Sequence, residues 1–173
     1  MQREYSSGKF QLGFGFWLCL VSFTTAGLVI WGGVAFQKSG EAKNEARTSR
    51  EIALTCTTDM ATKFHIHPHV KIEINGADQI VPANTGVKPT CMNSIHTHDA
   101  SGILHVESPV KKDFTVGDFF AVWGKEFNKN QILDYKTGTS TTITLTVNGK
   151  TTDTYEHTVM HDGDTMVISY GKH

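Results

Sequence analysis

Residues 10–36 contain no charged side chain and are rich in Phe, Trp, Leu, Val and Ile. About 20 apolar residues, rising about 1.5 Å each in a helix, cross the hydrocarbon core of a bilayer. A helix in a soluble core would be shorter and apolar on one side only, whereas this run is apolar on all sides. We therefore expect a single transmembrane helix over residues 10–36, preceded by a short flank at residues 1–9.

A cleavable signal peptide is the alternative interpretation of the same run. Arg3 and Lys9 form a basic start, and Gly33 to Ala35 form a small-x-small pattern near the end of the run. The apolar stretch is longer than the roughly 7 to 15 residues of a signal-peptide core, which favours an uncleaved span. Under either interpretation the rest of the chain is exported.

The charges around the run and the chemistry of the later residues predict opposite orientations. Two basic residues precede the run and four follow it, namely Arg3 and Lys9 before, and Lys38, Lys43, Arg47 and Arg50 after. The positive-inside rule alone would place the C-terminal part in the cytoplasm. However, acidic residues are interleaved with these following bases, and the later cysteines and histidines suit an oxidising compartment where metal ions are accessible. We therefore predict a single-pass protein of the cell membrane whose C-terminal domain lies outside the cytoplasm.

Residues 37–54 are polar, with Glu, Ala, Lys and Arg dominant. This composition predicts a solvated helical stalk or, equally, a disordered linker. The formal net charge of the whole chain is -1, which gives no basic surface for a nucleic acid. The partners expected are the membrane and, beyond it, subunits of a membrane complex.

From about residue 55 the hydrophobic pattern changes to a period of two, which is typical of half-buried strands. In residues 64–74 the apolar side chains share one parity and the histidines, Lys71 and Glu73 share the other. Pro68 lies inside this run, so the strand is expected to be an edge strand or to be bulged there.

Turn and cap signals complete the fold prediction. Asn-Gly pairs at 75–76 and 148–149 predict two hairpins. Thr115, followed by Asp118, predicts the start of the one short helix of this part of the chain. We therefore expect residues 55–173 to form a mostly β exported domain, a small sandwich or barrel-like structure with one short helix.

Histidine is the unusual feature of this domain, because the chain has nine and none lies before position 65. Six of them occur at alternating positions of predicted strands: His65, His67, His69, His96, His98 and His105. Same-parity side chains project from one face of a strand, and neutral imidazole is a good ligand for copper and zinc. We predict one copper or zinc ion on His67, His96, His98 and His105, with His65 and His69 supplementary. The other three, His157, His161 and His173, are interpreted as surface residues, with His161 a candidate late ligand.

Two acidic residues accompany these histidines. Glu107 lies on the same predicted strand as His105, and Asp99 follows His98. A carboxylate can orient a ligand histidine through its other ring nitrogen, so both are candidates for that supporting role. The alternative for Asp99 is a plain turn residue before Gly102.

Cys56 and Cys91 flank the first histidine strand. Two cysteines in one exported domain normally form a disulfide, which we predict here; the alternative is ligation of the metal by a thiolate. The spacing from Cys91 to His96 is superficially that of a blue-copper loop, but no methionine follows at the expected distance, so a cupredoxin is not favoured.

Longer motifs carry a resemblance to a family. The chain contains H-I-H-P-H from His65, then H-T-H-D-x-S-G-I-L-H-V-E-S-P from His96 and F-T-V-G-D-F-F-x-V-W-G from Phe114. Together they resemble a largely uncharacterised group of membrane-anchored extracytoplasmic proteins of archaea and bacteria, over most of residues 64–124. The resemblance implies that the histidines act as a unit and implies no reaction.

Three functions remain open from the sequence. The leading hypothesis is a membrane-tethered metal-binding module, with copper preferred to zinc because copper binds imidazole more strongly. The alternative is a zinc or iron enzyme of the hydrolase or oxygenase type, with Glu107, Glu73 or Asp99 as general base. The third is an accessory subunit of a membrane complex. More than four competent ligands favour binding over catalysis.

Overall fold

The computed structural model describes residue 40, residues 42–58 and residues 62–172. The chain divides into two compact units, Met1–Ala42 and Lys43–His173, and the second contains almost all the described residues. Strands dominate it, which confirms the prediction of a mostly β domain. No helix in the described part is long and apolar enough to cross a membrane. The flank at 1–9 and the transmembrane helix expected over 10–36 lie outside the described residues.

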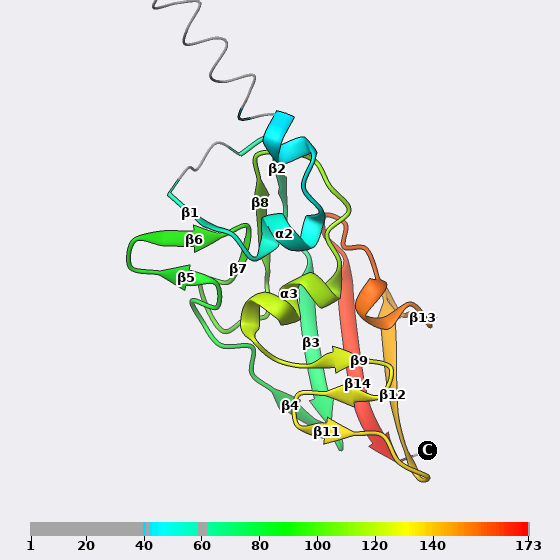
Figure 1. Cartoon of the computed structure of the whole chain (residues 1–173). Coiled ribbons are helices and arrows are strands. Elements are labelled where there is room, and N and C mark those ends of the chain that lie inside the picture. The colour runs from blue at the N-terminus through cyan, green and yellow to red at the C-terminus, as the bar shows by residue number, and fades with distance from the viewer. Residues whose placement is uncertain (1–39, 41, 59–61, 173) are drawn as a thin grey trace, which may run out of the picture. The chain divides into compact units, whose positions relative to one another are not determined.

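A five-stranded sheet forms the scaffold of the domain, in the order β13-β12-β14-β3-β4 (Figure 1). Its strands are β3 (His69–Ile74), β4 (Ala77–Gln79), β12 (Thr141–Val147), β13 (Lys150–Thr152) and β14 (Thr165–Lys172). The central strands β14 and β3 run parallel, and the other pairs are antiparallel. Ile72 and Ile168 are register partners in the two central strands and are both 0% exposed.

Both predicted hairpins are confirmed. Asn75 and Gly76 join β3 to β4 with φ angles of 52° and 81°, and Asn148 and Gly149 join β12 to β13 with 52° and 78°. A positive φ at both central positions defines a type I′ turn, which Asn-Gly adopts at little cost.

The domain also contains three smaller antiparallel sheets. The first contains β2 (Phe64–Ile66), β8 (His105–Ser108) and β7 (Ile95–His96), in that order. The second contains β1 (Cys56–Thr57), β6 (Cys91–Asn93) and β5 (Val87–Lys88). The third contains β9 (Phe127–Asn128), β10 (Gln131–Ile132) and β11 (Tyr135–Lys136).

The run at residues 64–74 is broken at Pro68 into two strands of different sheets. β2 pairs with β8, whereas β3 pairs with β14 and β4. Proline has no N–H to donate to a ladder, and here its carbonyl accepts from the Leu104 amide at 2.8 Å instead. The break therefore separates His69 from the strand that carries His65.

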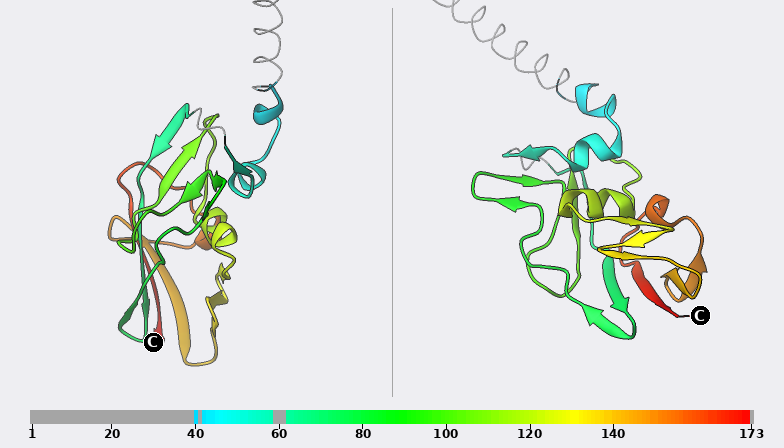
Figure 2. Two further views of the ribbon diagram at one scale, coloured as in Figure 1. Left: turned by 90° about the vertical axis from the view of Figure 1, so that its left-hand side faces the viewer. Right: turned by 60° about the horizontal axis from the view of Figure 1, so that its bottom comes forward.

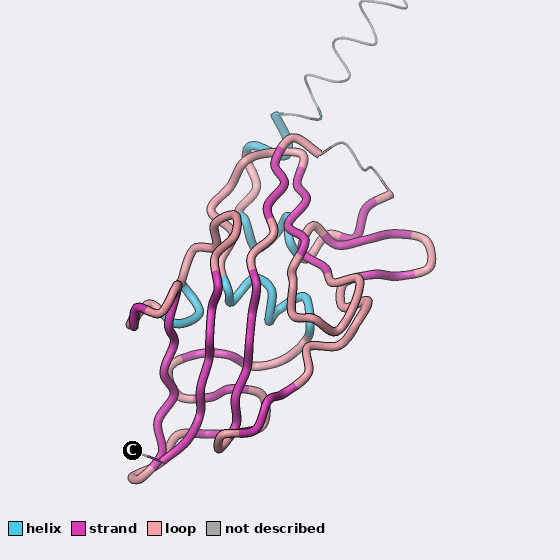
Figure 3. Tube along the Cα trace, turned by 180° about the vertical axis from the view of Figure 1, so that it is seen from behind, coloured by secondary structure: helices cyan, strands magenta, loops and turns pink. Residues whose placement is uncertain are grey.

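Helix α3 (Val116–Trp123) begins where the sequence predicts. Thr115 and Asp118 form a reciprocal capping box, and Gly124 ends the helix with φ 71°. Figure 2 shows α3 on one side of the five-stranded sheet. Figure 3 views the molecule from the opposite side, where the long strands lie nearer the viewer than α3. Phe119 and Phe120 of this helix are buried in the core.

A second helix, α2 (Ser49–Ala53), lies within the segment predicted as a stalk or linker. Ile52 and Ala53 are buried, and the Arg50 Nε atom lies 2.7 Å from Asp118 Oδ1. These contacts attach the segment to α3 within the second compact unit, Lys43–His173. A short 3-10 helix, η1 (Tyr155–His157), precedes the last strand.

Candidate metal centre

Strand pairing in the β2-β8-β7 sheet brings distant histidines together. β8 is the central strand, and its His105 is the register partner of His96 on β7. Its Glu107 is the register partner of His65 on β2. Five of the six predicted ligands gather around this sheet as a result.

These five histidines form two groups that could hold a metal ion, and His105 belongs to both. We call His96, His98 and His105 the inner triad, and His65, His67 and His105 the outer triad. Within each triad the ligand nitrogens lie within 4.8 Å of one another. The sequence prediction placed His67 with the inner set, whereas the structure places it with His65.

His96 is the most informative member of the inner triad. Its side chain is 0% exposed, and its Nδ1 atom lies 3.1 Å from the backbone oxygen of Asn93. A carbonyl oxygen can only accept, so Nδ1 carries the hydrogen and Nε2 carries a lone pair. Nε2 is buried and has no hydrogen-bond partner among the described residues. A buried acceptor without a hydrogen-bond donor costs free energy unless a ligand satisfies it. Metal-binding histidines typically donate a hydrogen bond from their other ring nitrogen, as His96 does here.

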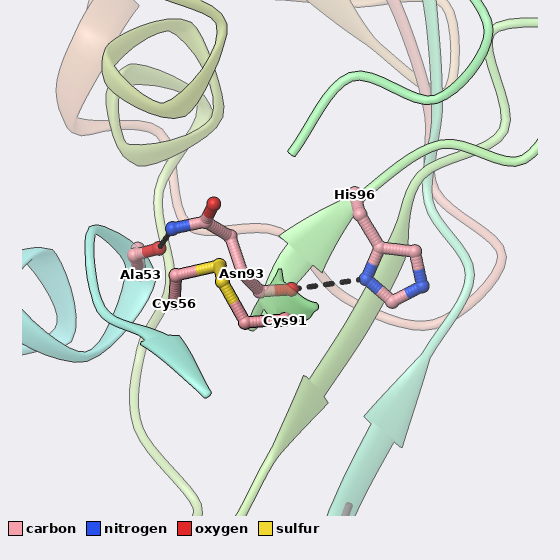
Figure 4. Close-up of a disulfide and its surroundings, with 5 residues drawn as sticks. All are labelled: Ala53, Cys56, Cys91, Asn93 and His96. Atoms are coloured by element: carbon pink, nitrogen blue, oxygen red, sulfur yellow. Dashed lines mark hydrogen bonds between the residues drawn. A yellow bond between two sulfur atoms is a disulfide. The ribbon is translucent and has the colours of Figure 1, made fainter. Parts of the chain in front are cut away.

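The support for His96 comes from a cross-linked region beside it (Figure 4). The predicted disulfide between Cys56 and Cys91 is confirmed, with Cα atoms 5.4 Å apart. Asn93, on the strand of Cys91, donates from Nδ2 to the Ala53 carbonyl at 2.9 Å. Because Cys91 is oxidised, thiolate ligation is not available to it, and the disulfide strand positions the carbonyl that fixes His96.

His98 and His105 complete the inner triad. The His105 ring lies 4.5 Å from the His98 ring and 5.5 Å from the His96 ring, centroid to centroid. Burial lowers the pKa of His96. Burial and then the proximity of His98 lower the pKa of His105. Both shifts favour the neutral imidazole, which is the form that binds metal.

The outer triad is more exposed and has carboxylates beside it. Glu107 Oε1 lies 3.2 Å from His65 Nε2 and 4.0 Å from His105 Nδ1, which fits the supporting role predicted for Glu107. Asp162 Oδ1 accepts from the His67 amide at 2.8 Å and lies 3.7 Å from His67 Nδ1. Sequence reasoning did not find Asp162, since its only local signal is a turn far from His67 in the chain.

His69 joins neither triad. Its Nε2 atom lies 2.8 Å from the Ser101 carbonyl and therefore donates to it. Gly102, with φ +86°, packs against the same ring, where a Cβ atom would lie 3.1 Å from His69 Nε2 and 2.4 Å from the Val70 oxygen. The break at Pro68 and this loop contact give His69 a structural position.

The other candidates belong to neither triad. Asp99 Oδ1 accepts from the Ser101 amide at 2.9 Å. Its hydrogen bonds with Ser101, and to a smaller extent the nearby charges of His105 and His98, lower its pKa. Glu73 contacts Lys71 and Ser169 on the scaffold sheet. His161 lies 3.1 Å from Asp164, and His157 is 3.6 Å from Glu156. The remaining histidine, His173, lies outside the described residues.

Comparisons of the chain with protein-family models, curated proteins and solved structures find no match. The site is therefore interpreted from its own geometry. That geometry gives a mostly β, histidine-rich domain with a disulfide and two overlapping histidine triads of metal-binding type.

Proposed function

We propose that this protein is a membrane-anchored extracytoplasmic metal-binding module that prefers copper to zinc, with the inner triad as its primary site. One observation carries the proposal, the buried Nε2 atom of His96 that has no partner among the described residues. The hydrogen bond from His96 Nδ1 to the Asn93 carbonyl fixes the orientation of the ring, and two further imidazoles lie beside it. A metal ion satisfies such a nitrogen, whereas an apolar core would not retain it.

The donor set supports copper. Three imidazole nitrogens suit both Cu(II) and Zn(II), and the affinity order of first-row ions favours Cu(II) on nitrogen ligands. Zinc sites of structural type use four ligands, often thiolates, and the two cysteines of this domain are joined to each other.

The proposed location rests on the apolar run and on the disulfide. A structural disulfide is typical of an oxidising compartment, which supports placing Lys43–His173 outside the cytoplasm behind a span at 10–36. Protease added to spheroplasts should digest this unit, and full protection would contradict the orientation. The same span offers a contact surface to subunits of a membrane complex, which co-purification from detergent-solubilised membranes tests.

Metal analysis of the full chain tests the binding function. The chain, purified in mild detergent without a histidine tag, is dialysed against Cu(II) or Zn(II) near neutral pH. We expect copper retention that His96→Ala together with His98→Ala abolishes at the inner triad. The matched control is His157→Ala, which removes an exposed histidine outside both triads. A chain that takes up neither metal contradicts the proposal.

A zinc or iron enzyme is the second candidate, and the position of Glu107 favours it. Of the three acidic residues considered as general base, Glu107 is the one found in contact with a triad histidine in the described part of the chain. Hydrolysis of an activated ester by the zinc-loaded chain tests this function. Glu107→Gln should remove the activity while the metal content is unchanged.

A further inference from the structure

The two triads share one residue, and this overlap suggests more than a single metal position. Building on the proposed function, we propose that the outer triad is a second copper site and that the imidazole of His105 bridges two Cu(II) ions. The inner ion is held by His96 and His98, and the outer ion by His65 and His67.

The rings are arranged as two pairs on either side of His105. The His105 centroid lies 4.5 Å from His98 and 4.7 Å from His67. Within the pairs, His96 and His98 are 4.8 Å apart and His65 and His67 are 4.4 Å apart. In the described structure no ring contact joins one pair to the other, so the five imidazoles do not converge on one point.

The two nitrogens of His105 allow it to serve both pairs. An imidazole binds a metal in the plane of its ring at about 2 Å from either nitrogen. The Nδ1 atom of His105 lies 4.0 Å from Glu107 Oε1, which is itself 3.2 Å from His65 Nε2. The Nδ1 edge therefore faces the outer pair, and Nε2 is assigned to the inner ion.

The number of donors also fits two ions better than one. Cu(II) takes about four strong ligands in a tetragonal arrangement, so one ion would leave part of this cluster unused. The outer triad and the adjacent Glu107 carboxylate offer three nitrogens and one oxygen, whereas the inner triad offers three nitrogens. Each set is large enough to hold one ion.

The bridge has a defined proton balance. With one ion bound, His105 is a neutral imidazole that keeps a hydrogen on its second nitrogen. The second Cu(II) replaces this hydrogen, one proton is released to solvent, and His105 becomes an imidazolate. No electron is transferred. The unpaired electrons of the two Cu(II) ions are then coupled through the ring.

Copper titration of the full chain, in mild detergent and without a histidine tag, tests the bridge. Bound copper is measured by elemental analysis, and the paramagnetic signal by double-integrated electron paramagnetic resonance at low temperature. We expect two ions per chain, with a signal that accounts for the first ion and then falls as the second binds. A pH-stat should record one additional proton released with the second ion.

Variants separate the two positions. His65→Gln with His67→Gln should bind one ion with a full, uncoupled signal, and His105→Ala should show no coupled pair. The control His157→Gln should behave as the unaltered chain. Uptake of one ion only, or of two ions with a full uncoupled signal, overturns this inference and leaves the proposed function standing. No uptake at all overturns both.

Discussion

The five-stranded scaffold sheet and the three-stranded β2-β8-β7 sheet solve different problems. The scaffold contains the long strands β12 and β14, of 7 and 8 residues, with fully buried isoleucines at its centre. The site sheet has strands of 3, 4 and 2 residues, and it carries the buried His96 and the half-buried His105. Both sheets bury apolar side chains, but the site sheet also buries an imidazole, which burial alone disfavours. Stability and metal binding are therefore expected to respond to different substitutions.

The site sheet buries one apolar row, formed by Ile66, Val106 and Ile95, and further connections hold the region around its histidines. The neighbouring β1-β6-β5 sheet is cross-linked by Cys56 and Cys91. Asn93, two residues from Cys91, forms hydrogen bonds with both Ala53 and His96. The region around the histidines is thus held by the disulfide and by the hydrogen bonds of Asn93. Removing the disulfide is therefore the first test of how the two sheets differ.

Removal of the disulfide should have the largest effect and should change both properties. Its cysteines are 35 residues apart, for which the chain-entropy estimate gives a loss of about 4 kcal/mol. Cys56→Ala with Cys91→Ala should therefore lower the unfolding free energy of the unit Lys43–His173 by about that amount, measured by urea denaturation. Copper affinity should also fall, because the Asn93 carbonyl that fixes His96 is no longer held. An unchanged copper affinity in the folded variant would show that the disulfide and the Asn93 hydrogen bond do not support the metal site.

Truncation of the scaffold core should change stability alone. Ile72→Ala removes a fully buried side chain of β3, which costs about 2 to 5 kcal/mol in comparable cores. Copper affinity of the variant, measured by competition dialysis under conditions where it is folded, should equal that of the unaltered unit. Ile80→Ala is the matched control, since Ile80 is 73% exposed and its loss should change stability by less than about 0.5 kcal/mol. A weakened copper site in Ile72→Ala would contradict the separation of the two sheets.

The contrast also explains which features the sequence could predict. Helix α3 and the two Asn-Gly hairpins are encoded by short-range patterns, and each was predicted from them. The capping box, for example, joins residues three positions apart. Local patterns of this kind do not depend on how the sheets are placed. The disulfide was predicted without any pattern, because the domain has two cysteines that can pair.

The grouping of the ligands depended on long-range pairing and was only partly predictable. The parity of residues 64–74 indicated one continuous face, but Pro68 divides the run between two sheets, so His69 contacts the Ser101 loop. Asp162 reaches His67 across 95 positions of the chain. The sequence identified the histidines as candidates, while the division into two triads required the register of β8 with its two neighbours.

Substitution of His96 should separate function from stability most clearly. His96→Leu removes the donor to the Asn93 carbonyl, and it also removes the unpartnered Nε2 atom. These two contributions are each of order 1 kcal/mol and oppose each other, so the metal-free unfolding free energy should change by less than about 1 kcal/mol. Binding of copper at the inner triad should be lost in equilibrium dialysis. A destabilisation as large as that of Ile72→Ala would mean that His96 is a structural residue of the core.

The smallest expected effect is a dependence of metal-free stability on pH. Burial lowers the pKa of His96, and burial together with His98 lowers the pKa of His105. In the unfolded chain both titrate near the ordinary value of about 6.5. As the pH falls below this value, the unfolded chain therefore binds protons that the folded domain does not, and the unfolding free energy must decrease. The decrease ends once the pH falls below the lowered pKa values of the folded histidines.

Urea denaturation of the metal-free unit between pH 7.5 and pH 5, with a chelator present, measures this decrease. One titrating group contributes at most about 1.4 kcal/mol per pH unit, and partial titration makes the observed slope smaller. His96→Leu should flatten the profile because it removes the more deeply buried of the two imidazoles. Ile80→Ala, which changes an exposed residue without a titrating group, should leave the slope unchanged. Saturating copper should steepen it, since protons and metal compete for the same nitrogens. A metal-free stability that rises on acidification, or an identical slope in His96→Leu, would contradict the neutral buried state assigned to His96, and with it the distinction between the inner triad and an exposed histidine cluster.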